Sequence, residues 1–167
     1  MKRGCRLLVL LMVFCFVASS CGRKERFARD ILLELCETAG ELPTGEIYHA
    51  AAEEGESGYL SSEMIESLYG EEGKEIFEET LKDYAVYLSS FAVPCEIAVL
   101  HTYSATDAHR VAAMCLSRAD EIQVALHRTE WERMGESIEV VVRGRWVVMI
   151  VTEVNEEVKA QTLRQIR

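Results

Sequence analysis

The sequence predicts a two-layer α+β fold, with helices packed on an antiparallel sheet of about four strands in two hairpins. Three observations support this prediction. Two pairs of short segments rich in β-branched residues are each joined by turn residues, a long amphipathic helix separates the pairs, and further helical segments flank them. The chain has 167 residues, and the part after residue 20 is a common size for one domain with its own core.

The N-terminal segment is typical of an export signal. Three basic residues lie within the first six positions, an apolar run follows over 7–18, and two serines then precede Cys21. That run is shorter than the roughly 20 residues that a spanning helix needs. We therefore expect a signal peptide over 1–20 and, as in bacterial lipoproteins, a lipid on Cys21. The alternatives are ordinary cleavage without lipid and a short uncleaved anchor.

The charge is distributed unevenly along the exported part of the chain. Residues 21–29 form a predicted lipidated cysteine and short basic tether, in which four cations outnumber the single anion, Glu25. From Asp30 onward the net charge is −16, because 27 acidic residues face 11 basic ones. This surplus excludes nucleic acid as a partner, since phosphate contacts need a basic face. The tether either favours anionic lipid or is simply solvated.

Residues 30–167 are predicted to be a single α+β domain whose first part, 41–80, is acidic and rich in loops. A helix is expected over 25–38, and Gly40 ends it. Residues 41–60 read as an exposed, poorly ordered connection, followed by a short helix capped by Ser62 and ending at Gly70. Twelve glutamates and one lysine lie over 41–80, which favours a solvated face over a divalent-cation site.

The C-terminal part of the sequence has the clearer pattern. Strands are predicted over 84–89 and 96–102. Ser104 and Asp107 match a capping box, and an apolar stripe then continues to Leu126. A hairpin over 138–142 and 146–151 is expected to turn at Gly144, and a last helix begins near residue 155 with acidic residues in its first turn.

Residues 84–123 and 140–152 resemble a domain-of-unknown-function family of Gram-positive bacterial lipoproteins. The shared features are the Glu96-Ile97-Ala98-Val99 strand, Arg118 late in the following helix, and a hairpin with Trp146 just after its glycine. The similarity covers about residues 61–166. The resemblance implies the fold and an anchored location outside the cytoplasm. The family has no known activity or catalytic residues, so the resemblance predicts neither.

Two residues are candidates for ligand binding. Glu96 opens an apolar strand and Arg118 lies about three turns into the long helix, so the two could bind a polar ligand, or form an ion pair that fixes the helix on the sheet. His101 shares a strand face with Ile97 and Val99, and with His109 and Glu96 it could form an acid–base or metal cluster. The interpretation of a hydrogen-bonded core histidine is favoured.

The mature chain retains Cys36, Cys95 and Cys115. Three buried thiols are favoured over one disulfide with one free thiol. The aromatic residues Tyr84, Tyr87, Tyr103 and Trp146 could form a binding surface, but their positions on or beside strands favour packing in or near the core. No catalytic residue, metal site or cofactor is predicted from motifs.

These patterns predict a non-enzymatic binding or accessory protein at the cell membrane, on the extracytoplasmic face. Its expected partners are the membrane, through Cys21, and an envelope protein or small ligand. Two alternatives are a hydrolase-like envelope enzyme that uses Glu96 with a histidine, and a self-associating structural protein. The enzyme requires Glu96, His101 and Arg118 to converge in one pocket.

Overall fold

The computed structural model describes residues 26–90, 93, 95–153 and 155–166, so the predicted signal peptide, Cys21 and most of the tether lie outside the described residues. The helices are α2 (Ala28–Ala39), α3 (Ser62–Glu75), the π-helix η1 (Ile76–Thr80), α4 (Ala105–Leu126), α5 (Glu132–Glu136) and α6 (Asn155–Gln165). The strands are β1 (Gly45–His49), β2 (Leu81–Ser89), β3 (Glu96–Thr102), β4 (Glu139–Arg143) and β5 (Trp146–Val151). In this part of the chain, no helix is both long and apolar enough to cross a bilayer.

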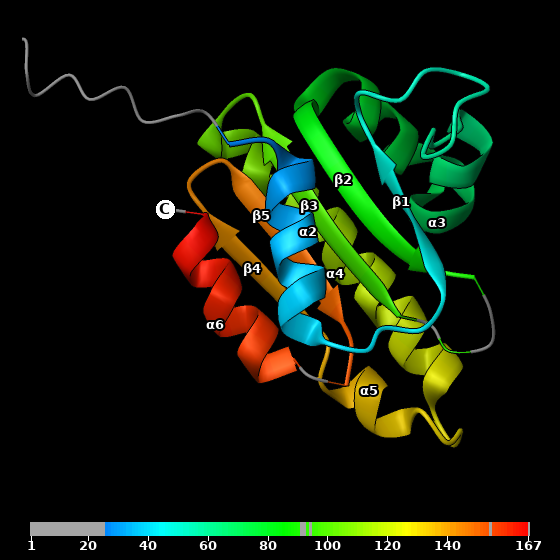
Figure 1. The fold of residues 1–167 in the computed structure, drawn as a ribbon. Coiled ribbons are helices and arrows are strands. Elements are labelled where there is room, and N and C mark those ends of the chain that lie inside the picture. Colours follow the sequence, from blue (N-terminus) through cyan, green and yellow to red (C-terminus); the bar gives the residue numbers. More distant parts are fainter. Residues whose placement is uncertain (1–25, 91–92, 94, 154, 167) are drawn as a thin grey trace, which may run out of the picture.

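The five strands form one antiparallel sheet in the order β1-β2-β3-β5-β4 (Figure 1). Both predicted hairpins, β2–β3 and β4–β5, are present, and they join where Ala98 of β3 lies opposite Met149 of β5. The α+β class and the antiparallel sheet are therefore confirmed. The sheet has five strands where about four were expected.

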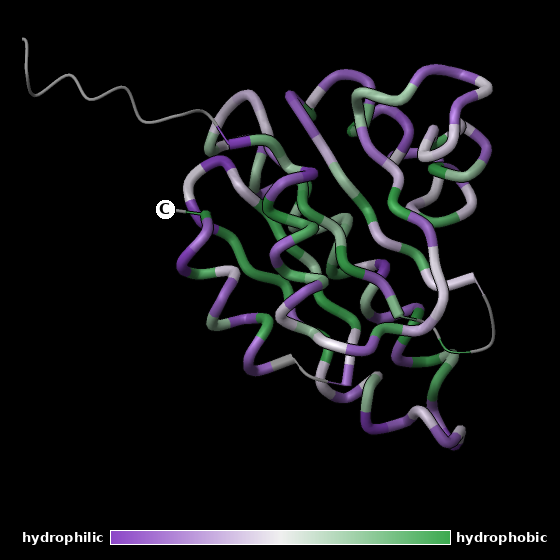
Figure 2. Tube along the Cα trace, in the orientation of Figure 1, coloured by the Kyte–Doolittle hydropathy of each residue, from purple (hydrophilic) through white to green (hydrophobic). Residues whose placement is uncertain are grey.

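Helices cover both faces of the sheet, so the expectation of two layers is wrong. On one face, Ala98, Leu100 and Met149 pack with residues of α3 and α4. On the other face, Ile97 and Val99 pack with α2 and with Val158 and Ile166 at the C-terminal end of the chain. Figure 2 shows the apolar segments concentrated in the central strands and in the helix sides that face them. Strands buried on both faces read as continuous apolar runs, as the sequence of β5 does.

The strand that the sequence did not predict is β1, which lies within the supposed loop 41–60. Gly45 allows close approach to β2, because a Cβ there would lie 2.4 Å from the carbonyl oxygen of Leu88. The following loop is bonded back to the strand, since Glu46 accepts hydrogen bonds from the Ser57 hydroxyl and the Gly58 amide. The segment is thus an ordered edge of the sheet. Its pattern was weak because no residue of β1 is fully buried.

Helix α3 differs from its prediction in its cap and in the second helical segment that follows Gly70. Its cap is Ser61, whose hydroxyl accepts from the Met64 amide, and not Ser62. Gly70 is non-helical, with φ +76° and ψ −179°, so the first helical segment ends there as predicted, and a second segment of α3 follows directly after it. The helical chain continues through η1 into β2, which begins at Leu81, three residues earlier than expected.

The long helix and the second hairpin match their predictions. The Ser104 hydroxyl accepts from the Asp107 amide at 3.1 Å, which begins α4 as the capping box predicted. Gly144 adopts φ +60° between β4 and β5, the left-handed conformation that a tight hairpin needs. Helix α4 ends at Leu126, the last residue of the predicted stripe.

We expect the neighbouring leucines of α2 to respond very differently to truncation. Leu32 is fully buried against the sheet, whereas Leu33 is 42 % exposed. Leu32→Ala should lower the free energy of unfolding by about 2–5 kcal/mol, because it leaves a cavity in the core. Leu33→Ala is the matched control and should change it by about 0.5 kcal/mol at most. Chemical denaturation measures both, and equally small losses would contradict the packing of α2 on the sheet.

Candidate functional site

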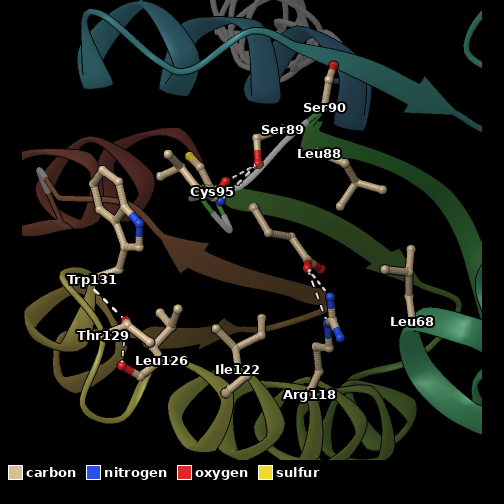
Figure 3. A pocket seen from close by; sticks show the side chains of 13 residues that line it. Leu68, Leu88, Ser89, Ser90, Cys95, Arg118, Ile122, Leu126, Thr129 and Trp131 are labelled. Atoms are coloured by element: carbon tan, nitrogen blue, oxygen red, sulfur yellow. Dashed lines mark hydrogen bonds and ion pairs between the residues drawn. The ribbon is translucent and has the colours of Figure 1, made fainter.

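A cavity of about 530 Å³ lies where β2 ends and β3 begins, beside the C-terminal half of α4 (Figure 3). Strand residues form one wall, α4 forms the opposite wall, and Trp131 closes one side. Most of the lining side chains are apolar, and Glu96 and Arg118 are its charged groups. The lining comprises Leu68, Leu88, Ser89, Ser90, Val93, Cys95, Glu96, Arg118, Ile122, Ala125, Leu126, Thr129 and Trp131.

The two candidate residues, Glu96 and Arg118, are brought together as predicted. Arg118 reaches across from α4, and its Nε and Nη2 each donate to Glu96 Oε2 at 3.3 Å. The other carboxylate oxygen, Oε1, accepts from the Tyr69 hydroxyl at 2.6 Å. Hydrogen bonds to an ionised group are short and strong, and this one joins α3 to β3. The carboxylate therefore links the sheet to two helices of the same face.

Burial determines the electrostatics of this group. Glu96 is only 3 % exposed, and the loss of solvation raises the pKa of its carboxyl, although Arg118 and the Tyr69 hydroxyl act in the opposite direction. The pKa of the buried Tyr69 phenol is raised well above its usual value, first by burial and then by the Glu96 charge. Tyr69 therefore keeps its proton and serves as a hydrogen-bond donor.

Arg118 also offers a charged edge to the cavity. Its side chain is 21 % exposed, and its third guanidinium nitrogen, Nη1, is 3.8 Å from Glu121 on the next turn. A long pair of this kind on the exposed side of the helix is weak, so a ligand anion can compete for Nη1. The cavity thus combines a cation at its inner wall with apolar surface from Ile122 and Trp131. This combination suits an amphipathic anion.

Two of the hydroxyl groups that line the cavity, those of Ser89 and Thr129, form structural hydrogen bonds. The Ser89 hydroxyl donates to the carbonyl of Val93 and accepts from the Cys95 amide, which shapes the turn between β2 and β3. The Thr129 hydroxyl donates to the carbonyl of Leu126 at the end of α4. Among the described residues, neither hydroxyl is hydrogen-bonded to Glu96, the carboxylate that lines the cavity. The arrangement supports binding more than nucleophilic chemistry.

The structure does not bring a histidine to Glu96. His101 lies on β3 at odd spacing from Glu96, so the two side chains point to opposite faces of the sheet. His101 is buried and stacks on Trp146 with ring centroids 3.9 Å apart, as expected of a core histidine. His109 is exposed near the start of α4. No histidine is among the described residues that line the cavity, so the acid–base pair of the enzyme alternative is absent from it.

The four aromatic residues selected from the sequence differ in how deeply they are buried. Tyr87 is buried, and Tyr84 and Trp146 are half-buried, as favoured from their places on strands. Tyr103, however, is 60 % exposed, because it follows the last residue of β3 and points away from both cores. Among the described residues, no group of three or more potential metal ligands is found.

The three cysteines among the described residues, Cys36, Cys95 and Cys115, are free thiols. Cys95 and Cys115 are buried and Cys36 is half-buried, close to the favoured interpretation of three buried thiols. Burial raises the pKa of Cys36 to about 11 and that of Cys95 to about 12. At neutral pH both therefore stay protonated and unreactive, which fits a packing role.

Sequence reasoning missed two residues of the site, Tyr69 and Trp131. Tyr69 lies four residues after the core residue Ile65, and this helical spacing was the available signal. Trp131 lies between α4 and α5 in a segment without clear periodicity. Its role depends on how the chain turns back after α4, which the local sequence does not encode.

No protein-family model matches the chain, and no significant match to it was found among curated proteins or solved structures. The resemblance to a lipoprotein family therefore stays a prediction. The interpretation of the site consequently depends on its own geometry.

We expect Glu96→Gln to alter how stability depends on pH. Because folding raises the pKa of Glu96, the folded protein binds this proton more tightly than the unfolded chain does. The resulting stabilisation is complete below the ordinary value of 4.5 and is lost as pH rises through the raised pKa. The unfolding free energy of the wild type should therefore fall relative to that of the variant as pH rises towards neutrality.

Urea denaturation at a series of pH values measures this difference. Glu121→Gln is the matched control, since Glu121 also contacts Arg118 but is 64 % exposed. Its stability should follow that of the wild type at every pH. If the Glu96→Gln curve ran parallel to the wild-type curve, the raised pKa would be refuted.

Proposed function

We propose that this protein is a lipid-anchored, non-enzymatic binding protein on the outer face of the cytoplasmic membrane. The basic, apolar and small-residue order before Cys21 supports the anchor. The diacylglyceryl group of a lipoprotein supplies two acyl chains, which is what stable anchoring needs. The cavity beside Glu96 and Arg118 supports the binding role, and it is the observation on which that role depends.

The chemistry of the cavity selects a ligand class. An anionic group can approach Nη1 of Arg118, while an apolar body can occupy the surface formed by Leu68, Ile122 and Trp131. A carboxylate, sulfonate or phosphate ester with an aliphatic or aromatic part has both features. The cavity volume of about 530 Å³ lies within the range of small-molecule sites.

Substitution at the proposed acylation site should release the protein from the membrane. With Cys21→Ala, we expect no incorporation of a labelled fatty acid and loss of the mature form from the membrane fraction, because no sulfur remains at the cleavage point. The matched control is Cys15→Ala, which removes a cysteine within the predicted signal peptide and should leave labelling unchanged. Metabolic labelling and intact-mass measurement test this, and an unlabelled wild-type protein would overturn the anchor.

Filling the cavity should weaken ligand binding without disturbing the fold. Ala125 lines the cavity from α4 and is exposed, so Ala125→Trp should occupy its apolar volume. Anilinonaphthalene sulfonate, an aromatic anion, serves as the probe, and its affinity should fall on the order of tenfold, about 1.4 kcal/mol. Fluorescence titration of the folded protein measures the affinity.

Ala113→Trp is the control for this experiment, because Ala113 is also an exposed residue of α4 but is not part of the cavity lining. It should leave the affinity for the probe unchanged. Equal affinities in the wild type and both variants would show that the probe does not enter this cavity, and the binding role would fail.

A further inference from the structure

We propose that the end of the domain from which the tether emerges is a membrane-docking surface for anionic phospholipid headgroups. We call it the tether-end surface, and it comprises Phe27, Arg29, Tyr103, Val142, Arg143, Arg145, Leu163 and Arg164. The inference rests on the proposed function only in that the anchor places a bilayer nearby. Its contacts are made by the folded domain itself.

The topology of the sheet brings the strand ends of this surface together. In the antiparallel order, β2 and β5 begin at the same end of the sheet at which β3 and β4 finish. The amide of Thr102, the last residue of β3, donates to the carbonyl of Arg145 in the turn between β4 and β5 at 2.9 Å. Tyr103 follows directly, so its exposed ring and the hairpin tip lie at one end of the molecule.

Two helix ends complete the surface. The Ala28 amide, at the start of α2, donates to Asp83 near the start of β2 at 2.6 Å. Arg143 donates from Nη1 to the carbonyl of Leu163, near the end of α6, at 2.9 Å. Figure 1 shows the start of α2, the β4–β5 turn and the C-terminal end of α6 at the same end of the domain.

The charge of this surface is opposite to that of the domain. Arg29, Arg143, Arg145 and Arg164 are all exposed, and none of them forms an ion pair with another described residue. Elsewhere, Arg110, Arg118 and Lys159 are paired with glutamates, whereas Lys74, Arg128 and Arg133 are exposed and, like the arginines of the surface, have no ion pair with another described residue. An anionic bilayer repels a domain of charge −16 in other orientations, and it attracts these arginines within a Debye length.

Carboxylates also occur at this end: Asp30, Asp83 and Asp107 lie on the α2 and α4 side, and the exposed Glu53, Glu54 and Glu56 follow β1 on the other side of β2. Asp83 accepts from the Ala28 amide, and Asp107 accepts from the Ser104 hydroxyl. Asp30 is exposed in the first turn of α2. Glu78 and Glu79 flank the surface on the side of η1 and limit it there. The hydrogen bonds of Asp83 and Asp107 leave the charge of these carboxylates in place, so the cationic part of the surface is the hairpin tip and the end of α6, where Arg143, Arg145 and Arg164 lie.

Exposed apolar side chains accompany the arginines. Of the seven large hydrophobic residues exposed in the described part of the chain, four belong to the tether-end surface: Phe27, Tyr103, Val142 and Leu163. Phe27 and Tyr103 are about 60 % exposed, and aromatic rings are favoured at the level of the headgroups. Phe27 comes six residues after Cys21, so an anchored chain holds it within about 20 Å of the bilayer.

Docking in this orientation determines how far the cavity lies from the bilayer. Glu96 begins β3 and Thr102 ends it, which places the binding cavity about 20 Å from the tether-end surface, at the opposite end of the sheet. The cavity then lies at the end of the sheet that is farther from the bilayer. A ligand would reach it from the envelope and not by lateral diffusion out of the lipid.

Vesicle binding of the unlipidated chain tests the surface independently of the anchor. The chain from Gly22 onward contains every residue of both core clusters, so it can be studied without the signal peptide and without lipid. We expect it to sediment with vesicles of phosphatidylcholine and phosphatidylglycerol, and not with vesicles of phosphatidylcholine alone. Its partitioning should weaken as salt is added.

Charge reversal at the surface should abolish this binding. Changing Arg29, Arg143 and Arg145 together to Glu should lower the partition coefficient by roughly a hundredfold or more, because each cation near an anionic surface contributes a several-fold effect. The matched control changes Lys74, Arg128 and Arg133 to Glu; these are three exposed cations outside the surface, and the alteration in net charge is the same. A much smaller loss in the control supports the proposal, and equal losses in the two variants overturn it.

The two tryptophans test the orientation in the complete, lipidated protein. Trp146 lies beside the hairpin tip, whereas Trp131 lines the cavity at the far end. In vesicles that contain a phospholipid spin-labelled on its headgroup, Trp131→Phe leaves only Trp146, whose fluorescence should be quenched. Trp146→Phe leaves only Trp131, which should be quenched much less.

Equal quenching of the two tryptophans, or stronger quenching of Trp131, would overturn the orientation. These results are distinguishable from failure of the proposed function. An unlabelled Cys21 or an unoccupied cavity leaves the vesicle binding of the unlipidated chain unaffected, and loss of vesicle binding leaves acylation and probe binding unaffected.

Discussion

The buried carboxylate of Glu96 is the constraint on which the arrangement of the sheet and its helices depends. An ionised carboxylate cannot be buried without partners, and here each oxygen has one, Tyr69 from α3 and Arg118 from α4. These bonds fix the position of both helices relative to the first residue of the central strand. Buried ion pairs of this kind contribute more to a unique arrangement than to net stability, and removal of one partner is far more costly than their absence.

The same constraint explains why a cavity lies beside the ion pair. Arg118 extends from α4 to Glu96 at the start of β3, and the cavity lies beside this pair, between α4 and the turn that joins β2 to β3. The space on the far side is bounded by Leu126 and Trp131, where the chain reverses after α4. The cavity therefore lies directly beside the ion pair that attaches α4 to the sheet.

The sequence predicted those elements whose signals are local. The Ser104 cap, the stripe through α4, the glycine of the second hairpin and strand β3 depend on periodicity and turn chemistry within a few residues. The Glu96–Arg118 pair could be predicted because a charged residue at the start of an apolar strand needs a partner. Strand β1 could not be predicted, because it is stabilised by its pairing with β2 and by hydrogen bonds from residues 57 and 58 to Glu46, 11 and 12 residues earlier in the chain.

The layer count failed for a related reason. Two layers were inferred from the two hairpins and the long helix between them, but each strand of the central pair is apolar on both faces, and the amphipathic stripe of α2 covers the second face. That stripe belongs to the first helix after the tether, so a helix expected to lead into the domain is instead part of its core. Its start is bonded to β2 through Asp83. The chain therefore enters the domain at a fixed point, and in the proposed anchored state that point is what places this end of the sheet near the bilayer.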